Sequence, residues 1–138
     1  MSDPYGQPPG PYGQQPGTAS PDDRTWALVA HLGSLVTAWF AFGFIAPLLV
    51  MLVKSDSPFV RGHAVESLNF QISMLIYSIV ATVVGFLVVV LTLGLGLLVV
   101  IPLVLVALVV ILVLVLQASM RASRGEEYRY PFTLRLIP

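Results

Sequence analysis

The sequence predicts an all-α integral membrane protein, a helical bundle of three to four helical segments behind a disordered N-terminal tail. Of the 138 residues, 57% are hydrophobic and only 10% are charged, which is too little charge for the surface of an ordinary soluble domain. The charges are also unevenly placed, because none occurs between Arg24 and Lys54 or between Glu66 and Arg121. Gaps of this length are typical of helices that cross the apolar core of a bilayer, which is about 30 Å thick.

The tail, residues 1–21, is rich in Pro, Gly, Gln and Tyr. Residues 4–10 recur as residues 11–17 with one change, from Pro8 to Gln15. Such a composition buries too little apolar surface to offset the loss of chain entropy, so we expect no fold there. The tail is interpreted as a solubilising linker, or else as a ligand for a partner domain or a self-associating tail built on Tyr5 and Tyr12.

Residues 22–138 are expected to form the transmembrane domain. Its first helical segment spans about 24–53, and its apolar part would be about 43 Å long as a straight helix, which exceeds the bilayer core. We therefore expect a break near 43–47, where Gly43 and Pro47 lie. Two interpretations remain open: one long kinked span, or two short helical pieces that form a re-entrant hairpin.

The second helical segment, 58–91, begins after a polar stretch that ends at Pro58. A helical projection places apolar side chains in one stripe that we expect to face lipid, formed by Val65, Leu68, Ile72, Leu75, Ile76 and Ile79. Polar side chains line the two edges of the remaining arc. One edge consists of His63, Glu66, Asn69, Ser73 and Tyr77, and the other of Ser67, Gln71, Ser78 and Thr82. Such edges favour packing against another helix within the bilayer.

The third helical segment, 97–120, is the longest apolar run, and the C-terminal segment, 121–138, follows it. This last segment combines cations with alternating aromatic and apolar residues, which indicates an interfacial position. The expected interfacial anchors are Trp26, Arg121, Arg124, Tyr128 and Tyr130. The distribution of cations places the 54–66 loop and the C-terminus in the cytoplasm and leaves the side of the N-terminal tail open.

The candidate functional residues are the polar side chains within the apolar segments, namely His31, His63, Glu66, Asn69, Gln71 and Ser73. We expect them to form a polar face between helices. The alternative is that His31, His63 and Glu66 titrate in an ion pathway. No catalytic residue, metal site or cofactor is expected, since the chain has two His, no Cys and no nucleophile or phosphate-loop motif. The net charge of zero gives no case for nucleic-acid binding.

Several motifs resemble a bacterial membrane-protein family of unknown function. They are DRTWA at 23–27 with His31-Leu32, SPFVRGHA at 57–64, SLNFQIS at 67–73 and GEEYRYPFT at 125–133. That family is in turn similar to the Tic-type protein-import component of the chloroplast inner envelope, which is implicated in a protein-conducting channel and to which four spans are attributed. The resemblance covers about Asp23 to Ile137 and supplies no catalytic residues.

The combined prediction is a small non-enzymatic membrane protein that acts in protein translocation or membrane assembly. The alternative is a small transporter or ion-pathway subunit. We expect a multi-pass protein of the bacterial cytoplasmic membrane. Its expected partners are the lipid bilayer and either further copies of the chain or other membrane proteins.

Overall fold

The computed structural model describes residues 19–38, 43–54 and 56–138. These residues form four helices and no strand: α1 (Pro21–Ala38), α2 (Ile45–Val53), α3 (Pro58–Leu91) and α4 (Leu97–Ser123). The all-helical fold class is therefore confirmed. Residues 1–18, which hold the repeat of the expected disordered tail, lie outside the described residues.

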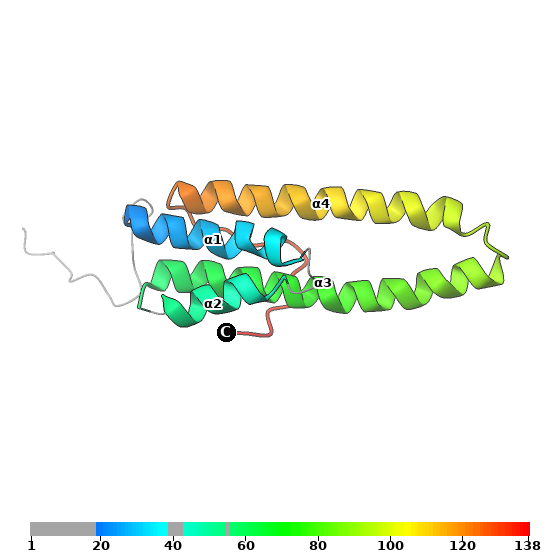
Figure 1. Ribbon diagram of the computed structural model, residues 1–138, viewed down its shortest axis with the longest axis horizontal. Coiled ribbons are helices and arrows are strands. Elements are labelled where there is room, and N and C mark those ends of the chain that lie inside the picture. Colours follow the sequence, from blue (N-terminus) through cyan, green and yellow to red (C-terminus); the bar gives the residue numbers. More distant parts are fainter. Residues whose placement is uncertain (1–18, 39–42, 55) are drawn as a thin grey trace, which may run out of the picture.

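The helices form two hairpins that open toward the same end of the molecule (Figure 1). The short hairpin consists of α1 and α2, about 27 and 14 Å long, and the long hairpin consists of α3 and α4, about 51 and 40 Å long. Asp22 at the start of α1 and Lys54 directly after α2 form an ion pair with an N–O distance of 2.8 Å. The two ends of the first apolar segment thus meet, and the segment forms a hairpin. Its re-entrant position in a membrane stays a prediction.

Local chemistry explains where the helices begin. The hydroxyl of Ser20 accepts a hydrogen bond from the Asp23 N–H, and that of Ser57 accepts one from the Val60 N–H, so a serine caps both α1 and α3. Gly43 and Phe44 form a turn directly before α2. Pro47 lies in the first turn of α2, where its missing N–H costs no helical hydrogen bond.

Helix α1 is the centre of the packed part of the molecule. It contacts each of the other three helices, and it lies between α3 and α4 (Figure 1). A Cβ atom on Gly33 would lie 2.8 Å from the Cβ atom of Ala46, so the absence of a side chain at Gly33 permits the close approach of α2. One apolar cluster, formed by Ala30, Val50, Val60 and Ala64, joins α1, α2 and α3.

Beyond the end of α1, neither α1 nor α2 packs against the long hairpin of α3 and α4. We call residues 75–91 and 97–110 the arms and the remaining described residues, except the connection 92–96, the head. Both α3 and α4 are long and apolar enough to cross a membrane, and almost no residue of their most apolar stretches is buried. The arms are about 25 and 21 Å long, so the apolar surface needed for a 30 Å bilayer core continues onto the head. More than half of the surface of Val36, Leu49 and Leu52 is exposed there.

The expected lipid-facing stripe of α3 is exposed only within the arm. Leu75 and Ile79 are exposed, but Leu68 is buried within the head, where α1 and α2 pack against α3. The boundary between the two environments therefore falls inside the helix, which the apolar character of the stripe did not reveal. All seven Lys and Arg residues lie in the head, and the connection between the arms, residues 92–96, carries no charge.

Candidate functional site

The polar edge of α3 binds the backbone of the C-terminal segment. This edge, which we define as Glu66, Asn69, Ser73 and Tyr77, has the 3–4–4 spacing that places side chains on one face of a helix. Its side chains bind main-chain groups of residues 130–137 at distances of 2.8–3.0 Å, as follows. Glu66 accepts from the Tyr130 N–H, Ser73 from the Leu134 N–H, and Asn69 from the N–H groups of Leu136 and Ile137, while Asn69 donates to the Ile137 carbonyl and Tyr77 to the Phe132 carbonyl.

The C-terminal segment turns at Pro131 and Phe132 and then runs back along α3 toward the open end of the hairpins. Phe132 has a φ of 59°, in the left-handed region that is unfavourable for a residue with a bulky side chain. Its side chain is 86% exposed, and those of Leu134 and Leu136 are exposed as well. Hydrogen bonds to the backbone, and not burial of these apolar side chains, therefore hold residues 132–136 in place.

Tyr130 is the exception within the segment, because its side chain is buried. Its ring stacks on Phe70 with a centroid distance of 4.0 Å and an interplanar angle of 13°. The two residues form the second apolar cluster of the head together with Val115 and Ala118 of α4. The expectation that Tyr130 is an interfacial anchor is wrong, since only 2% of its surface is exposed.

A chain of hydrogen bonds joins Tyr130 to both histidines. The Tyr130 hydroxyl lies 3.0 Å from Nδ1 of His31, and Nε2 of His31 lies 2.9 Å from Nδ1 of His63. Burial, together with the nearby Tyr128 and Glu66, raises the pKa of Tyr130 above its ordinary value, so the phenol keeps its proton and can donate it. In the arrangement in which Tyr130 donates to His31, His31 donates to His63, and the remaining proton of the neutral His63 ring lies on Nε2.

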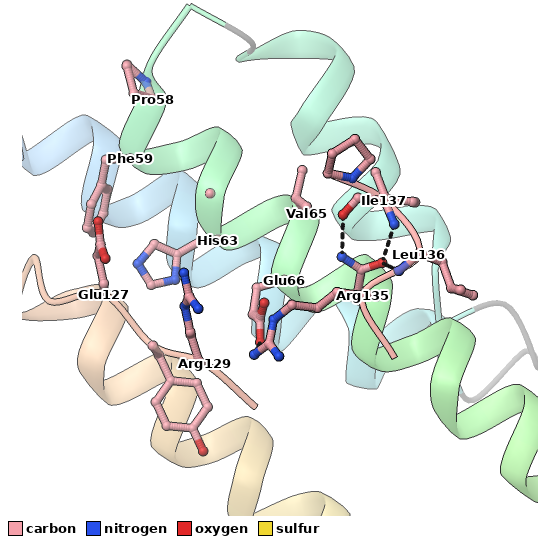
Figure 2. A pocket seen from close by; sticks show the side chains of 14 residues that line it. Pro58, Phe59, His63, Val65, Glu66, Glu127, Arg129, Arg135, Leu136 and Ile137 are labelled. Carbon is pink, nitrogen blue, oxygen red and sulfur yellow. Dashed lines mark hydrogen bonds and ion pairs between the residues drawn. The ribbon is translucent and has the colours of Figure 1, made fainter. Parts of the chain in front are cut away.

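The His63 side chain lines a pocket of about 520 Å³ between the first turns of α3 and the C-terminal segment. The carbonyl of Glu126 is near the His63 ring. However, Nε2 of His63 makes no hydrogen bond of suitable geometry with any described residue, although the side chain is buried. Figure 2 shows Glu127 and Arg129 on the same side of the pocket as His63, and Arg135 beside Glu66. The Arg135–Glu66 distance is 3.4 Å, so these two charges form an ion pair.

The structure thus brings together five of the six predicted polar residues. His31 and His63 contact each other, and Glu66, Asn69 and Ser73 contact the C-terminal segment. Gln71 lies on the other edge of α3, next to the Gly43 turn. A functional role for any of these side chains stays a prediction.

The remaining expected anchors lie in the head. Trp26 packs against the apolar cluster around Ala30, with the Lys54 ammonium 5.6 Å from its ring centroid. Arg121 forms an ion pair with Glu126, Arg124 is exposed at the end of α4, and Tyr128 is half-buried. Helix α4 continues to Ser123, three residues beyond the expected end at residue 120, so Arg121 belongs to its last turn.

Sequence reasoning missed that the C-terminal segment completes the head. The period-two pattern from Tyr128 to Leu136 and the polar edge of α3 were both visible, but nothing in either pattern paired them. Arg129 and Arg135 were seen as interfacial cations and not as parts of a pocket. Among the described residues, no group of three or more His, Asp or Glu side chains is placed to hold a metal ion.

Comparison with known proteins identifies a family. The sequence model of a protein family, described as the magnetosome magnetite crystal formation protein family, matches residues 22–137. This is most of the chain, so the chain belongs to that family. This supports the expected membership of a bacterial membrane-protein family. The match does not extend to the chloroplast import component, and that part of the resemblance stays a prediction. No curated protein and no solved structure matches the chain.

The hydrogen bond between Tyr130 and His31 can be tested by Tyr130→Phe, which keeps the ring on Phe70 and removes only the hydroxyl. We expect the free energy of unfolding in detergent to fall by about 1–3 kcal/mol, because the buried Nδ1 of His31 loses its partner. The matched control is Tyr128→Phe, whose hydroxyl makes an exposed bond of 3.4 Å to Gln117 and should change stability by less than about 0.5 kcal/mol. Denaturant unfolding followed by circular dichroism measures both, and equal effects would contradict the proposed bond.

Proposed function

We propose that this member of the magnetosome magnetite crystal formation protein family is a non-enzymatic integral membrane protein that organises a membrane site where other components assemble. In this proposal the arms lie in the bilayer and anchor the head at the membrane surface. The head then presents the C-terminal segment and the pocket to partners. Those partners are other membrane proteins or a second copy of the chain.

One observation carries the proposal, namely the separation of charge along the molecule. Every Lys and Arg belongs to the head, whereas the arms and the connection between them carry no formal charge. An ionised side chain inside a bilayer core is costly, so the arms suit lipid and the charged surface of the head suits water. A protein built in this way places a polar surface of fixed shape beside a membrane.

The orientation follows from the same separation. Lys and Arg are retained on the cytoplasmic side of bacterial membranes. We therefore propose that the head faces the cytoplasm of the bacterial cytoplasmic membrane and that residues 92–96 reach the opposite side. Ser20 lies at the start of α1, where Asp22 pairs with Lys54. The N-terminal tail, which precedes Ser20, therefore belongs on the cytoplasmic side too.

Membrane assembly is favoured over protein translocation as the finer role. The family description names magnetite crystal formation in magnetosomes and does not mention translocation of proteins. The translocation role rests on the resemblance to the chloroplast import component alone.

An ion pathway is less well supported than assembly. His31 and His63 are in hydrogen-bond contact, as a proton relay requires. A pathway across the bilayer would also need titratable groups along the arms, and the chain has no Asp, Glu, Lys, Arg or His between Glu66 and Arg121.

The topology can be tested by single-cysteine labelling, because the chain contains no Cys. In intact cells a membrane-impermeant maleimide should label Leu95→Cys. It should label Ser20→Cys and Ser123→Cys only after the membrane is permeabilised. Labelling of Ser123→Cys in intact cells would overturn the orientation, and labelling of Ser20→Cys and Ser123→Cys from opposite sides would overturn the re-entrant arrangement.

The organising role can be tested by placing a photoreactive amino acid at Arg61, an exposed position in the head, and at Leu95 between the arms. Illumination of living cells should give a reproducible set of protein adducts from position 61, because the head is the surface offered to partners. Position 95 is the matched control and should give none of these adducts. The same adducts from both positions, or none from position 61, would contradict the proposal.

A further inference from the structure

The pocket at the start of α3 holds polar groups that the fold itself does not use. Nε2 of His63 is buried beside the Glu126 carbonyl and makes no hydrogen bond of suitable geometry with a described residue. Arg129 and Glu127 make no hydrogen bond or ion pair with another described residue. We propose that this pocket binds a phosphate ester that carries an amino group, the chemistry of a phosphoethanolamine head group.

The phosphate would lie between His63 and Arg129. When Tyr130 donates to His31, a proton is left on Nε2 of His63, and the bond to His31 fixes the other side of the ring. Arg129 adds a positive charge whose planar fork matches phosphate oxygens. Pro58 and Phe59, in the first turn of the 34-residue helix α3, also line the pocket, and the dipole of a helix favours an anion at this end.

The amino group would lie at Glu127, on the same side of the pocket (Figure 2). The other acidic lining residue, Glu66, is already occupied by Arg135 and by the Tyr130 N–H. The unused charges of these lining side chains are therefore one cation and one anion. A ligand with a charge of each sign matches this pair better than a simple anion does.

Gly62 supplies an independent observation. Glycine in place of alanine within a helix lowers the folding equilibrium constant by about tenfold or less. Glycine is therefore typical of positions where another group must approach the backbone closely. A Cβ atom added at Gly62 would meet no atom of the described residues within 4 Å. The packing of the described residues thus gives no reason for a glycine at this position, and Gly62 lines the pocket. A bound ligand in close contact with the helix gives one.

The pocket also has apolar walls. Phe59, Val65 and Leu136 line it, and the exposed apolar surface of α2 reaches Leu52 at the same end of the head. A phospholipid could therefore place its head group in the pocket and its acyl chains along the head. Soluble phosphoethanolamine offers the same charged groups without the chains. The inference deepens the proposed function by naming a ligand of the head.

Binding can be measured on the full chain in detergent by native mass spectrometry and by the shift in melting temperature on adding lipid. We expect phosphatidylethanolamine to bind more tightly than phosphatidylglycerol, which has the phosphate but no amino group. Arg129→Gln should weaken binding of both lipids by about tenfold or more, because a charge-assisted hydrogen bond is lost. Glu127→Gln should remove only the preference for phosphatidylethanolamine.

Two further variants separate ligand binding from folding. Arg124→Gln removes the same charge from an exposed position outside the pocket and should leave binding unchanged. Gly62→Ala should keep or raise the melting temperature without lipid and weaken lipid binding, a combination that a purely structural glycine would not produce.

Equal binding of both lipids by the unmodified chain would overturn the role of Glu127. Equal weakening by Arg129→Gln and Arg124→Gln, or unchanged binding in Arg129→Gln, would overturn the site. Soluble phosphoethanolamine that binds as tightly as the lipid would support the same chemistry and identify a soluble ligand as the source. Because these measurements use detergent, they can fail while the topology holds, and the topology can fail while they succeed.

Discussion

The hydrogen bonds between the polar edge of α3 and the backbone of residues 130–137 are the interaction on which the rest of the head depends. An extended segment without a partner strand has N–H and carbonyl groups that must be satisfied when it packs against protein. Glu66, Asn69, Ser73 and Tyr77 satisfy them from a helix, with each bond contributing about 1 kcal/mol. The same bonds bring Tyr130 to His31 and make Arg129 and Arg135 part of the pocket wall. Without the segment, the polar edge of α3 would lose these partners.

The membrane imposes a second constraint, because it requires an apolar surface. Helix α3 meets this constraint and also binds the C-terminal segment. Along its first five turns α3 carries polar groups that bind α1 and the C-terminal segment, and from Leu75 onward it exposes apolar side chains. Helix α1 fills the space between α3 and α4 only at the open end of the molecule, with α2 packed against α1 and α3, and this is why the arms remain uncovered. The ion pair between Asp22 and Lys54 closes that hairpin in the region where water can solvate both charges. The boundary between head and arms is thus set by where helix packing stops and not by where a helix ends.

Sequence reasoning succeeded where local chemistry decides the outcome. The charge gaps indicated apolar helices, Pro58 after Ser57 indicated the start of α3, and the helical spacing of Glu66, Asn69 and Ser73 indicated a shared face. It failed where two distant segments meet. Whether residues 24–53 span or double back depends on contacts of α1 with α3 and α4, and these are absent from the pattern of one segment. Tyr130 was assigned to the interface because an aromatic residue beside arginines is typical of that position. The stack on Phe70 that buries it joins residues 60 positions apart, which no local pattern encodes.

The claim that the polar edge of α3 holds the C-terminal segment is tested most directly by hydrogen exchange in Asn69→Leu. This variant removes the acceptor for two amides and the donor to one carbonyl of residues 136–137, whereas Ser78→Ala removes only a bond within α3, to the Leu75 carbonyl. The account predicts that amide exchange of residues 130–137 becomes at least tenfold faster in Asn69→Leu and stays unchanged in Ser78→Ala, while α4 keeps its protection in both. Unchanged protection of residues 130–137 in Asn69→Leu would contradict it.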